Sequence, residues 1–218
     1  MFSEELVTFL EELRANNNKP WFDAHRTRYD ALRGQFLDLT TEIIAASSRF
    51  DADLADLQAS SCMFRINRDI RFSKEKTPYK TTFSAVLSPG KKDSMQGYYY
   101  CIDANGSLEV GAGIHQPDTA RLQKLRKAIV REGEKLDGVL KEPKLKKSFG
   151  TLDGEQLKTA PRDYPPDHPY IHYLRHKGFT VGCSESVVDI PEDALATHVA
   201  DLFATASPLV KLIREWCS

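Results

Sequence analysis

The sequence predicts an α+β fold: a single domain over residues 1–218 in which several α-helices pack against one antiparallel β-sheet. Apolar residues recur at helical spacing in residues 4–50 and, for the most part, in residues 118–217. Between them, in residues 62–114, the apolar period is two, as in half-buried strands. Because strands close enough to form hairpins lie between two helical regions, an antiparallel sheet is favoured over a doubly wound one.

Two helices are expected in the N-terminal region. The first has an apolar stripe made of Leu6, Phe9, Leu10 and Leu13, and Ser3 is its expected N-cap. The run Asn16-Asn17-Asn18 ends it, and Pro20 suits the first turn of the next helix. The stripe of that second helix is the clearest in the chain and ends near Phe50; it consists of Tyr29, Leu32, Phe36, Leu39 and Ile43.

The alternation in residues 62–72 predicts a half-buried strand with a charged outer face. Its apolar positions are Phe64, Ile66, Ile70 and Phe72, and its polar positions are Arg65, Asn67, Asp69 and Arg71. Arg68 is the exception to this alternation, because it is a charged residue at a position where the pattern expects an apolar one. A second strand is expected from Thr81 to Leu87, ended by Pro89-Gly90.

Residues 98–103 and 107–114 are expected to form a hairpin around Ala104-Asn105-Gly106. A three-residue loop with Gly106 in the left-handed conformation is preferred, because it gives the hairpin one apolar face. That face consists of Tyr98, Tyr100, Ile102, Leu108, Val110 and Ala112. Gly111 and Gly113 then lie on the opposite face, where another backbone or a ligand can approach closely.

The remaining elements follow from the same patterns. A helix is expected from Pro117-Asp118 to about Leu140, followed by a basic connector at Lys141–Lys147 and a long loop at 148–167. A short helix from Pro169 to Gly178 leads to a strand at Phe179–Val188, the later strand of the sheet. The final helix is expected at 192–217 and is interrupted or kinked at Pro208.

Composition limits the class of protein. The chain has 218 residues and a net charge of −1, which argues against a purely electrostatic nucleic-acid binder. It has neither a membrane-spanning apolar run nor a signal-peptide pattern at its start, so a cytoplasmic location without membrane association is expected. The four scattered cysteines predict free thiols rather than a disulfide framework or a zinc site. No metal or cofactor is expected.

The most unusual stretch is residues 65–80, here called the basic segment. It carries six basic side chains against the acidic Asp69 and Glu75, a local charge of +4 in a chain whose net charge is −1. Arginine and lysine side chains bind phosphate and carboxylate groups, and a tyrosine can stack on a ligand ring or donate a hydrogen bond. The expected ligand-binding residues are therefore Arg65, Arg68, Arg71, Lys74, Lys76, Tyr79 and Lys80.

Evidence for catalysis is weaker. Asp69, within the basic segment, and His115, after the hairpin, are the candidate acid–base residues. The chain contains no glycine-rich phosphate motif and no nucleophile elbow. His168, His172 and His176 recur at intervals of four, which suits a metal pair on a helix, but a surface-exposed polar face with His168 as a cap is the favoured interpretation.

Several of these motifs resemble the family known as domain of unknown function 2461. They are Asn17-Asn18-Lys19-Pro20-Trp21-Phe22 with His25-Arg26 and Tyr29, Arg68-Asp69-Ile70-Arg71-Phe72-Ser73-Lys74-Glu75-Lys76-Thr77-Pro78-Tyr79-Lys80-Thr81, the tyrosine-rich strand before Gly111-Ala112-Gly113, and His168-Pro169 leading to Lys177-Gly178-Phe179. The resemblance covers nearly the whole chain. It implies a cytoplasmic protein of bacterial or fungal type with a single α+β domain, and it implies no particular reaction, substrate or catalytic residue.

The preferred hypothesis is that the basic segment binds a phosphate-bearing small molecule or a nucleotide. One alternative is nucleic-acid binding, aided by Lys91, Lys92 and Lys141–Lys147. Another is docking of an acidic protein partner, and the simplest is a solvated strand face whose arginines pair with nearby carboxylates. The sequence leaves open whether the protein is an enzyme.

Overall fold

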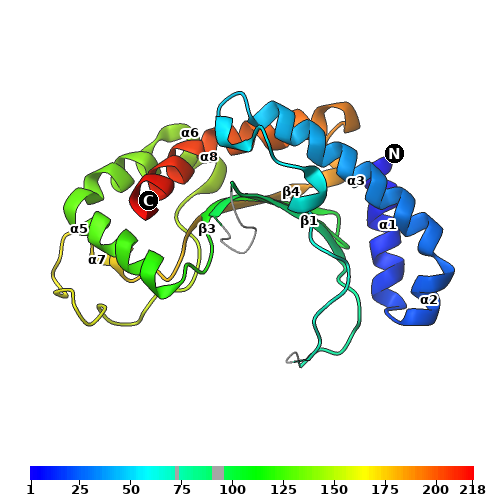
Figure 1. Cartoon of the computed structure of the whole chain (residues 1–218), viewed down its shortest axis with the longest axis horizontal. Coiled ribbons are helices and arrows are strands. Elements are labelled where there is room, and N and C mark those ends of the chain that lie inside the picture. Colours follow the sequence, from blue (N-terminus) through cyan, green and yellow to red (C-terminus); the bar gives the residue numbers. More distant parts are fainter. Residues whose placement is uncertain (72–73, 90–95) are drawn as a thin grey trace. The chain divides into compact units, whose positions relative to one another are not determined.

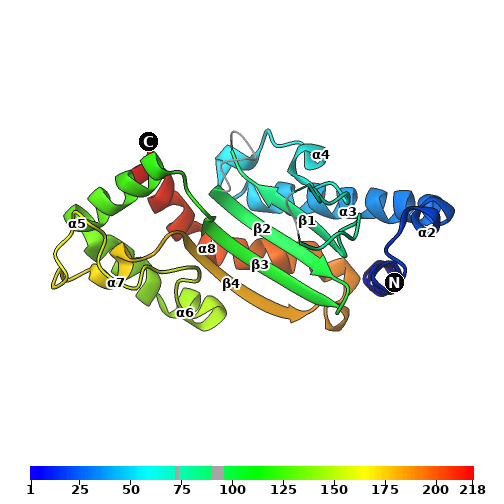
Figure 2. The same cartoon turned by 90° about the horizontal axis from the view of Figure 1, so that it is seen from below.

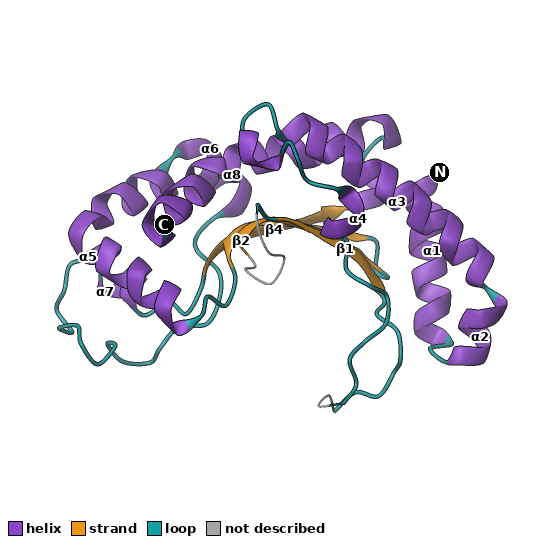
Figure 3. Cartoon of the chain, viewed as in Figure 1, coloured by secondary structure: helices purple, strands orange, loops and turns teal. Residues whose placement is uncertain are grey.

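The computed structural model describes residues 1–71, 74–89 and 96–218 and has the α+β architecture that the sequence predicts (Figures 1 and 3). The helices are α1 (Phe2–Ala15), α2 (Lys19–Ala24), α3 (Arg26–Ser47), α4 (Ala59–Cys62), α5 (Thr119–Lys141), α6 (Pro143–Phe149), α7 (Ile171–Leu174) and α8 (Leu195–Cys217). The strands are β1 (Thr82–Leu87), β2 (Gln96–Asp103), β3 (Ser107–Ile114) and β4 (Phe179–Ser186). They form one antiparallel sheet in the order β1-β2-β3-β4, which Figure 2 shows.

The chain divides into two compact units, each built from three stretches of sequence. Unit 1 comprises Met1–Leu87, Tyr99–Val110 and Ser184–Asp201, and unit 2 comprises Ser88–Tyr98, Gly111–Cys183 and Leu202–Ser218. The basic segment, helices α1 to α4 and the tip of the hairpin therefore belong to unit 1. Helices α5 to α7 belong to unit 2.

The core of unit 1 lies between α3 and the sheet. The predicted stripe of this helix is buried, and Phe36 stacks on Tyr100 with ring centroids 5.1 Å apart. The hydroxyl groups of Thr40 and Tyr100 are 2.6 Å apart, so the buried phenol has a hydrogen-bond partner. The predicted second helix is divided at His25 into α2 and α3, and Asn18 caps α2 by accepting a hydrogen bond from the N–H of Trp21.

The predicted hairpin is confirmed. Gly106 has a φ of 75°, and all six side chains of the predicted apolar face are buried. In unit 2, Gly113 has a φ of 127°, and a Cβ atom at this position would lie 2.0 Å from the carbonyl oxygen of Phe179. The close approach expected at this glycine is therefore that of the backbone of β4.

Two local predictions at helix ends are wrong, and the start of a third helix is shifted. Ser3 is not an N-cap: α1 begins at Phe2, whose N–H donates to Oε2 of Glu192 at 3.0 Å. A carboxylate from a distant segment thus replaces the local cap. The expected connector at Lys141–Lys147 is also wrong, because its residues end α5 and begin α6, where Glu142 accepts hydrogen bonds from the N–H groups of Lys144 and Leu145. The final helix begins at Leu195, after a short 3₁₀ turn, and continues through Pro208.

Candidate functional site

The described residues of the basic segment form two antiparallel extended stretches and do not form a strand of the sheet. Residues 65–71 and 74–80, here called the basic arm, are joined by hydrogen bonds from the N–H of Arg68 to the carbonyl of Pro78 (2.9 Å) and from the N–H of Lys80 to the carbonyl of Ile66 (2.8 Å). Figure 1 shows the arm leading into β1. The strand predicted for residues 62–72 is thus wrong over its described part, 62–71, where the ladder is reduced to isolated bridges at Met63 and Asn67.

The residues of the arm explain why it does not form a regular strand ladder. Pro78 has no N–H to donate to a ladder, and repulsion between the neighbouring cations opposes tight pairing. The predicted alternation nevertheless survives: Ile66 is buried while Arg65, Asn67, Asp69 and Arg71 are exposed. Phe72, which belonged to the same predicted pattern, lies outside the described residues.

The base of the arm is held by the loop between α1 and α2. The side chain of Asn17 donates to the carbonyl of Tyr79 and accepts from its N–H, both at 3.0 Å, as a neighbouring strand would. Phe22 stacks on the ring of Tyr79 with centroids 4.1 Å apart. Tyr79 was expected to face a ligand, but its side chain is only 6% exposed and serves to anchor the arm.

Asn17→Ala is expected to destabilise the protein by about 1–2 kcal/mol, because the N–H and carbonyl of Tyr79 both lose their partner. The arm should also become easier to cleave by a protease such as trypsin. Urea denaturation and timed proteolysis measure the two effects. The matched control is Asn16→Ala, an exposed neighbour whose side chain bonds only within its own helix end; equal effects of the two substitutions would contradict the anchoring role.

Two arginines of the arm are paired with its acidic residues. Arg71 donates to both carboxylate oxygens of Asp69, at 3.0 and 2.6 Å, and Arg68 forms an ion pair with Glu75. The hydrogen bonds from Arg71 lower the pKa of Asp69, and those from Thr77 and Arg68 lower the pKa of Glu75. A carboxylate with a lowered pKa is a weaker base, so the geometry gives Asp69 a role in orienting Arg71 rather than in taking up protons.

Three cations gather where the arm meets the sheet. Arg65, Arg68 and Lys80, here called the cation cluster, are close enough that burial first, and then the two arginines, lower the pKa of the Lys80 amine. The Lys80 ammonium lies 5.1 Å from the centre of the Phe64 ring. Among the described residues, Nε of Arg68 is buried without a hydrogen-bond partner, and Arg65 and Lys80 have no ion-pair partner. In the described part of the chain, Glu75 on Arg68 is thus the one carboxylate paired with the cluster, and positive charge remains in excess there.

Beside the cation cluster lies a polar face of the sheet that the sequence-based search missed. In unit 1 the face of β1, β2 and β3 that faces away from α3 carries Thr82, Ser84, Tyr99, Cys101 and Glu109, here called the polar sheet face. Burial raises the pKa of the Tyr99 hydroxyl, which interacts with Cys101 and Ser84. Burial likewise raises the pKa of the Cys101 thiol to about 11, so this thiol is protonated at neutral pH.

The other candidate residues are not brought to the arm. His115 is exposed and belongs to unit 2, whereas Asp69 belongs to unit 1. Helix α7 covers only Ile171–Leu174, so it does not carry the three histidines on one face. His168 accepts a hydrogen bond from the N–H of Tyr170 at 3.1 Å, like a cap, whereas His176 is buried and burial lowers its pKa, which corrects its assignment to the surface.

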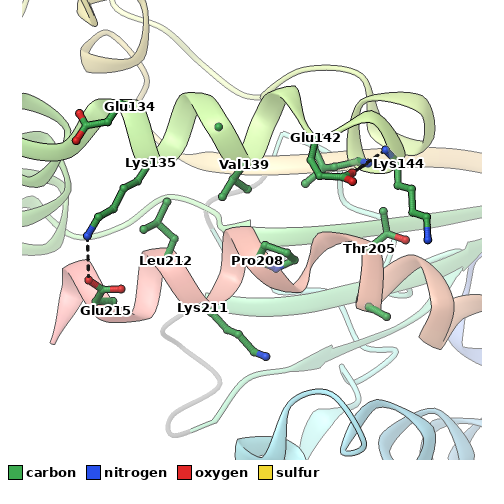
Figure 4. A pocket seen from close by; sticks show the side chains of 13 residues that line it. Glu134, Lys135, Val139, Glu142, Lys144, Thr205, Pro208, Lys211, Leu212 and Glu215 are labelled. Atoms are coloured by element: carbon green, nitrogen blue, oxygen red, sulfur yellow. Dashed lines mark hydrogen bonds and ion pairs between the residues drawn. The ribbon is translucent and has the colours of Figure 1, made fainter.

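The described residues contain no group of three His, Cys, Asp or Glu side chains placed to hold a metal ion. Unit 2 does contain a pocket of about 760 Å³ between α5–α6 and α8 (Figure 4). Val139, Pro208 and Leu212 give it an apolar lining, and Lys135 reaches across it to Glu215 at 3.8 Å. Its charged residues are three basic and three acidic, so the pocket does not share the cationic character of the arm.

The model of the family described as conserved hypothetical protein (DUF2461) matches residues 5–212, a range that includes the arm, the polar sheet face and most of both units. No curated protein and no solved structure matches the chain. In the part of the chain that the structure describes, the helices lack the combination of length and apolar character needed to cross a bilayer.

Proposed function

The chain belongs to the DUF2461 family of conserved hypothetical proteins, and from its own residues we propose that the basic arm binds a phosphate-bearing small molecule or nucleotide at the cation cluster. The observation that carries the proposal is the gathering of Arg65, Arg68 and Lys80; burial first, and then repulsion by the two arginines, lowers the pKa of Lys80. A bound phosphate dianion would relieve this repulsion and give the buried Nε of Arg68 an acceptor.

Two further features support a small ligand over an acidic protein surface. Lys80 is half-buried and rests against Phe64, so a compact anion reaches it more easily than a broad macromolecular surface does. The arginines offer planar pairs of donors, which suit the oxygens of a phosphate group. A cytoplasmic location is part of the proposal, and it is supported by four cysteines that form no disulfide.

The experiment is a thermal-shift series with inorganic phosphate, pyrophosphate, nucleotides and short oligonucleotides at low salt. Pyrophosphate and nucleotides are expected to raise the melting temperature in proportion to the logarithm of their concentration once it exceeds Kd, and added salt should reduce the shift. A shift with the oligonucleotides alone would favour nucleic-acid binding instead. The absence of a shift with every anion would refute the proposal.

A further inference from the structure

We infer that the pocket of unit 2 between α5–α6 and α8, here called the helix pocket, binds a free medium-chain fatty acid. The inference concerns a second site and does not depend on the proposed function of the basic arm. The volume of the pocket, about 760 Å³, lies within the range of small-molecule sites. Its lining residues all belong to unit 2, so a single compact unit builds the whole site.

The floor of the helix pocket is apolar and partly open to water. Leu145 and Leu212 are buried beneath it, Val139 is half-buried, and Gly138 and Pro208 are exposed. Gly138 adds room, because no heavy atom lies within 4 Å of a Cβ atom built there. An acyl chain laid along this floor would remove its exposed apolar surface from water, which is favourable.

The length of the helix pocket suits a medium acyl chain. Its α8 side includes Thr205 and Glu215, ten residues apart, which is roughly 15 Å at the rise of an α-helix. An extended chain advances about 1.2 Å per bond, so about twelve carbon atoms cover this length. At one end Nζ of Lys135 lies 3.8 Å from Oε1 of Glu215, and this ion pair joins α5 to α8 (Figure 4). A long partner helix would have to displace the pair, whereas a short ligand ends before it.

The opposite end of the helix pocket carries a cation that can receive a carboxylate. Lys144 extends towards α8 beside Thr205 (Figure 4), and it forms no ion pair with the residues that the structure describes. An ammonium group and a carboxylate form charge-assisted hydrogen bonds. The head group of a fatty acid therefore suits this end.

The acidic residues of the lining do not oppose this placement. Glu142 accepts hydrogen bonds from the N–H groups of Lys144 and Leu145, at 2.6 and 3.1 Å, so its charge is directed to the backbone. Glu215 is paired with Lys135, and Glu134 precedes Lys135 at the same far end of the pocket.

Calorimetric titration with dodecanoate, octanoate and dodecyltrimethylammonium, each below its micelle-forming concentration, tests the inference. Each methylene group that leaves water adds about two- to fourfold to the affinity, so dodecanoate is expected to bind at least about tenfold more tightly than octanoate. Dodecyltrimethylammonium has the same chain with a positive head group, and it should bind at least about tenfold more weakly than dodecanoate.

Two variants separate the chain from the head group. Gly138→Phe fills the pocket and should weaken dodecanoate binding at least about tenfold, whereas Gly34→Phe, in α3 and equally free of heavy atoms within 4 Å, should not. Lys144→Gln should cost dodecanoate about tenfold and leave dodecyltrimethylammonium unchanged. Lys147→Gln, also exposed on α6, is its matched control, and circular dichroism checks that each variant folds.

Equal affinities for dodecanoate and dodecyltrimethylammonium, or unchanged dodecanoate binding in Gly138→Phe, would overturn the inference. So would the absence of dodecanoate binding together with a dimer in sedimentation that Gly138→Phe dissociates, because the pocket would then be an interface between two copies of the chain. The proposed function of the arm is tested separately and is unaffected by either result.

Discussion

Replacing Arg65 and Lys80 together with alanine is expected to weaken the binding of pyrophosphate about a hundredfold, because two charge-assisted hydrogen bonds are lost at once. Arg68 remains in the variant, but one of its terminal nitrogens is paired with Glu75, so it compensates only in part. Calorimetry on the native and variant proteins measures the effect. Both replaced side chains lack an ion-pair partner among the described residues, so the fold should persist, and circular dichroism checks this.

The matched control removes the same two charges elsewhere. Lys146 and Lys147 are exposed on α6 and are not part of the cation cluster, so Lys146→Ala/Lys147→Ala should change the affinity for pyrophosphate by less than about threefold, since salt screens exposed charges that do not contact the ligand. If the two double variants lost affinity equally, binding would depend on net charge and not on the cation cluster.

Gly113→Ala is expected to lower the free energy of unfolding by roughly 4 kcal/mol or more, one of the largest effects of a single substitution. The φ of 127° strains any side chain, and the new Cβ atom would meet the backbone of Phe179 at 2.0 Å. Neither strand can move without breaking the pairing of β3 with β4. Urea denaturation followed by circular dichroism measures the loss.

Gly138→Ala provides the control for this experiment. Gly138 lies within α5, and no heavy atom lies within 4 Å of a Cβ atom built there. Alanine favours a helix over glycine by about 1 kcal/mol, so this variant should be more stable than the native protein. A Gly113→Ala variant of native stability would contradict the described approach of β4.

Periodicity predicted the parts of the fold that local sequence controls. The stripe from Tyr29 to Ile43 and the register of the hairpin both depend on which side chains share a face, and a single register gave the hairpin an apolar face. The burial of these residues confirms both predictions. The α+β class followed from the order of these elements.

Two predictions failed because a distant residue supplied the decisive contact. The cap of α1 comes from Glu192, and the partner of Tyr79 is Asn17, 62 positions away. Sequence reasoning therefore placed Tyr79 in the ligand site, although the two motifs that contain Asn17 and Tyr79 were both noticed. Only the tertiary contact between Asn17 and Tyr79 shows that both motifs hold the base of the arm.

The polar sheet face was missed for a different reason. The alternation that assigned Tyr98, Tyr100 and Ile102 to the core also places Tyr99 and Cys101 on the other face, so the signal was present. Only Gly111 and Gly113 were singled out on that face, because its nearness to Lys80 depends on β1 lying beside β2 and on the arm entering β1.

Lysine footprinting tests the central claim, that anions bind at the cation cluster, most directly. Exposed lysines are methylated with and without pyrophosphate, and modification at each site is measured by mass spectrometry. Pyrophosphate is expected to protect Lys80 strongly and to leave Lys146 and Lys147 unchanged. Protection of the α6 lysines with Lys80 unaffected, or uniform protection of every lysine, would contradict the claim.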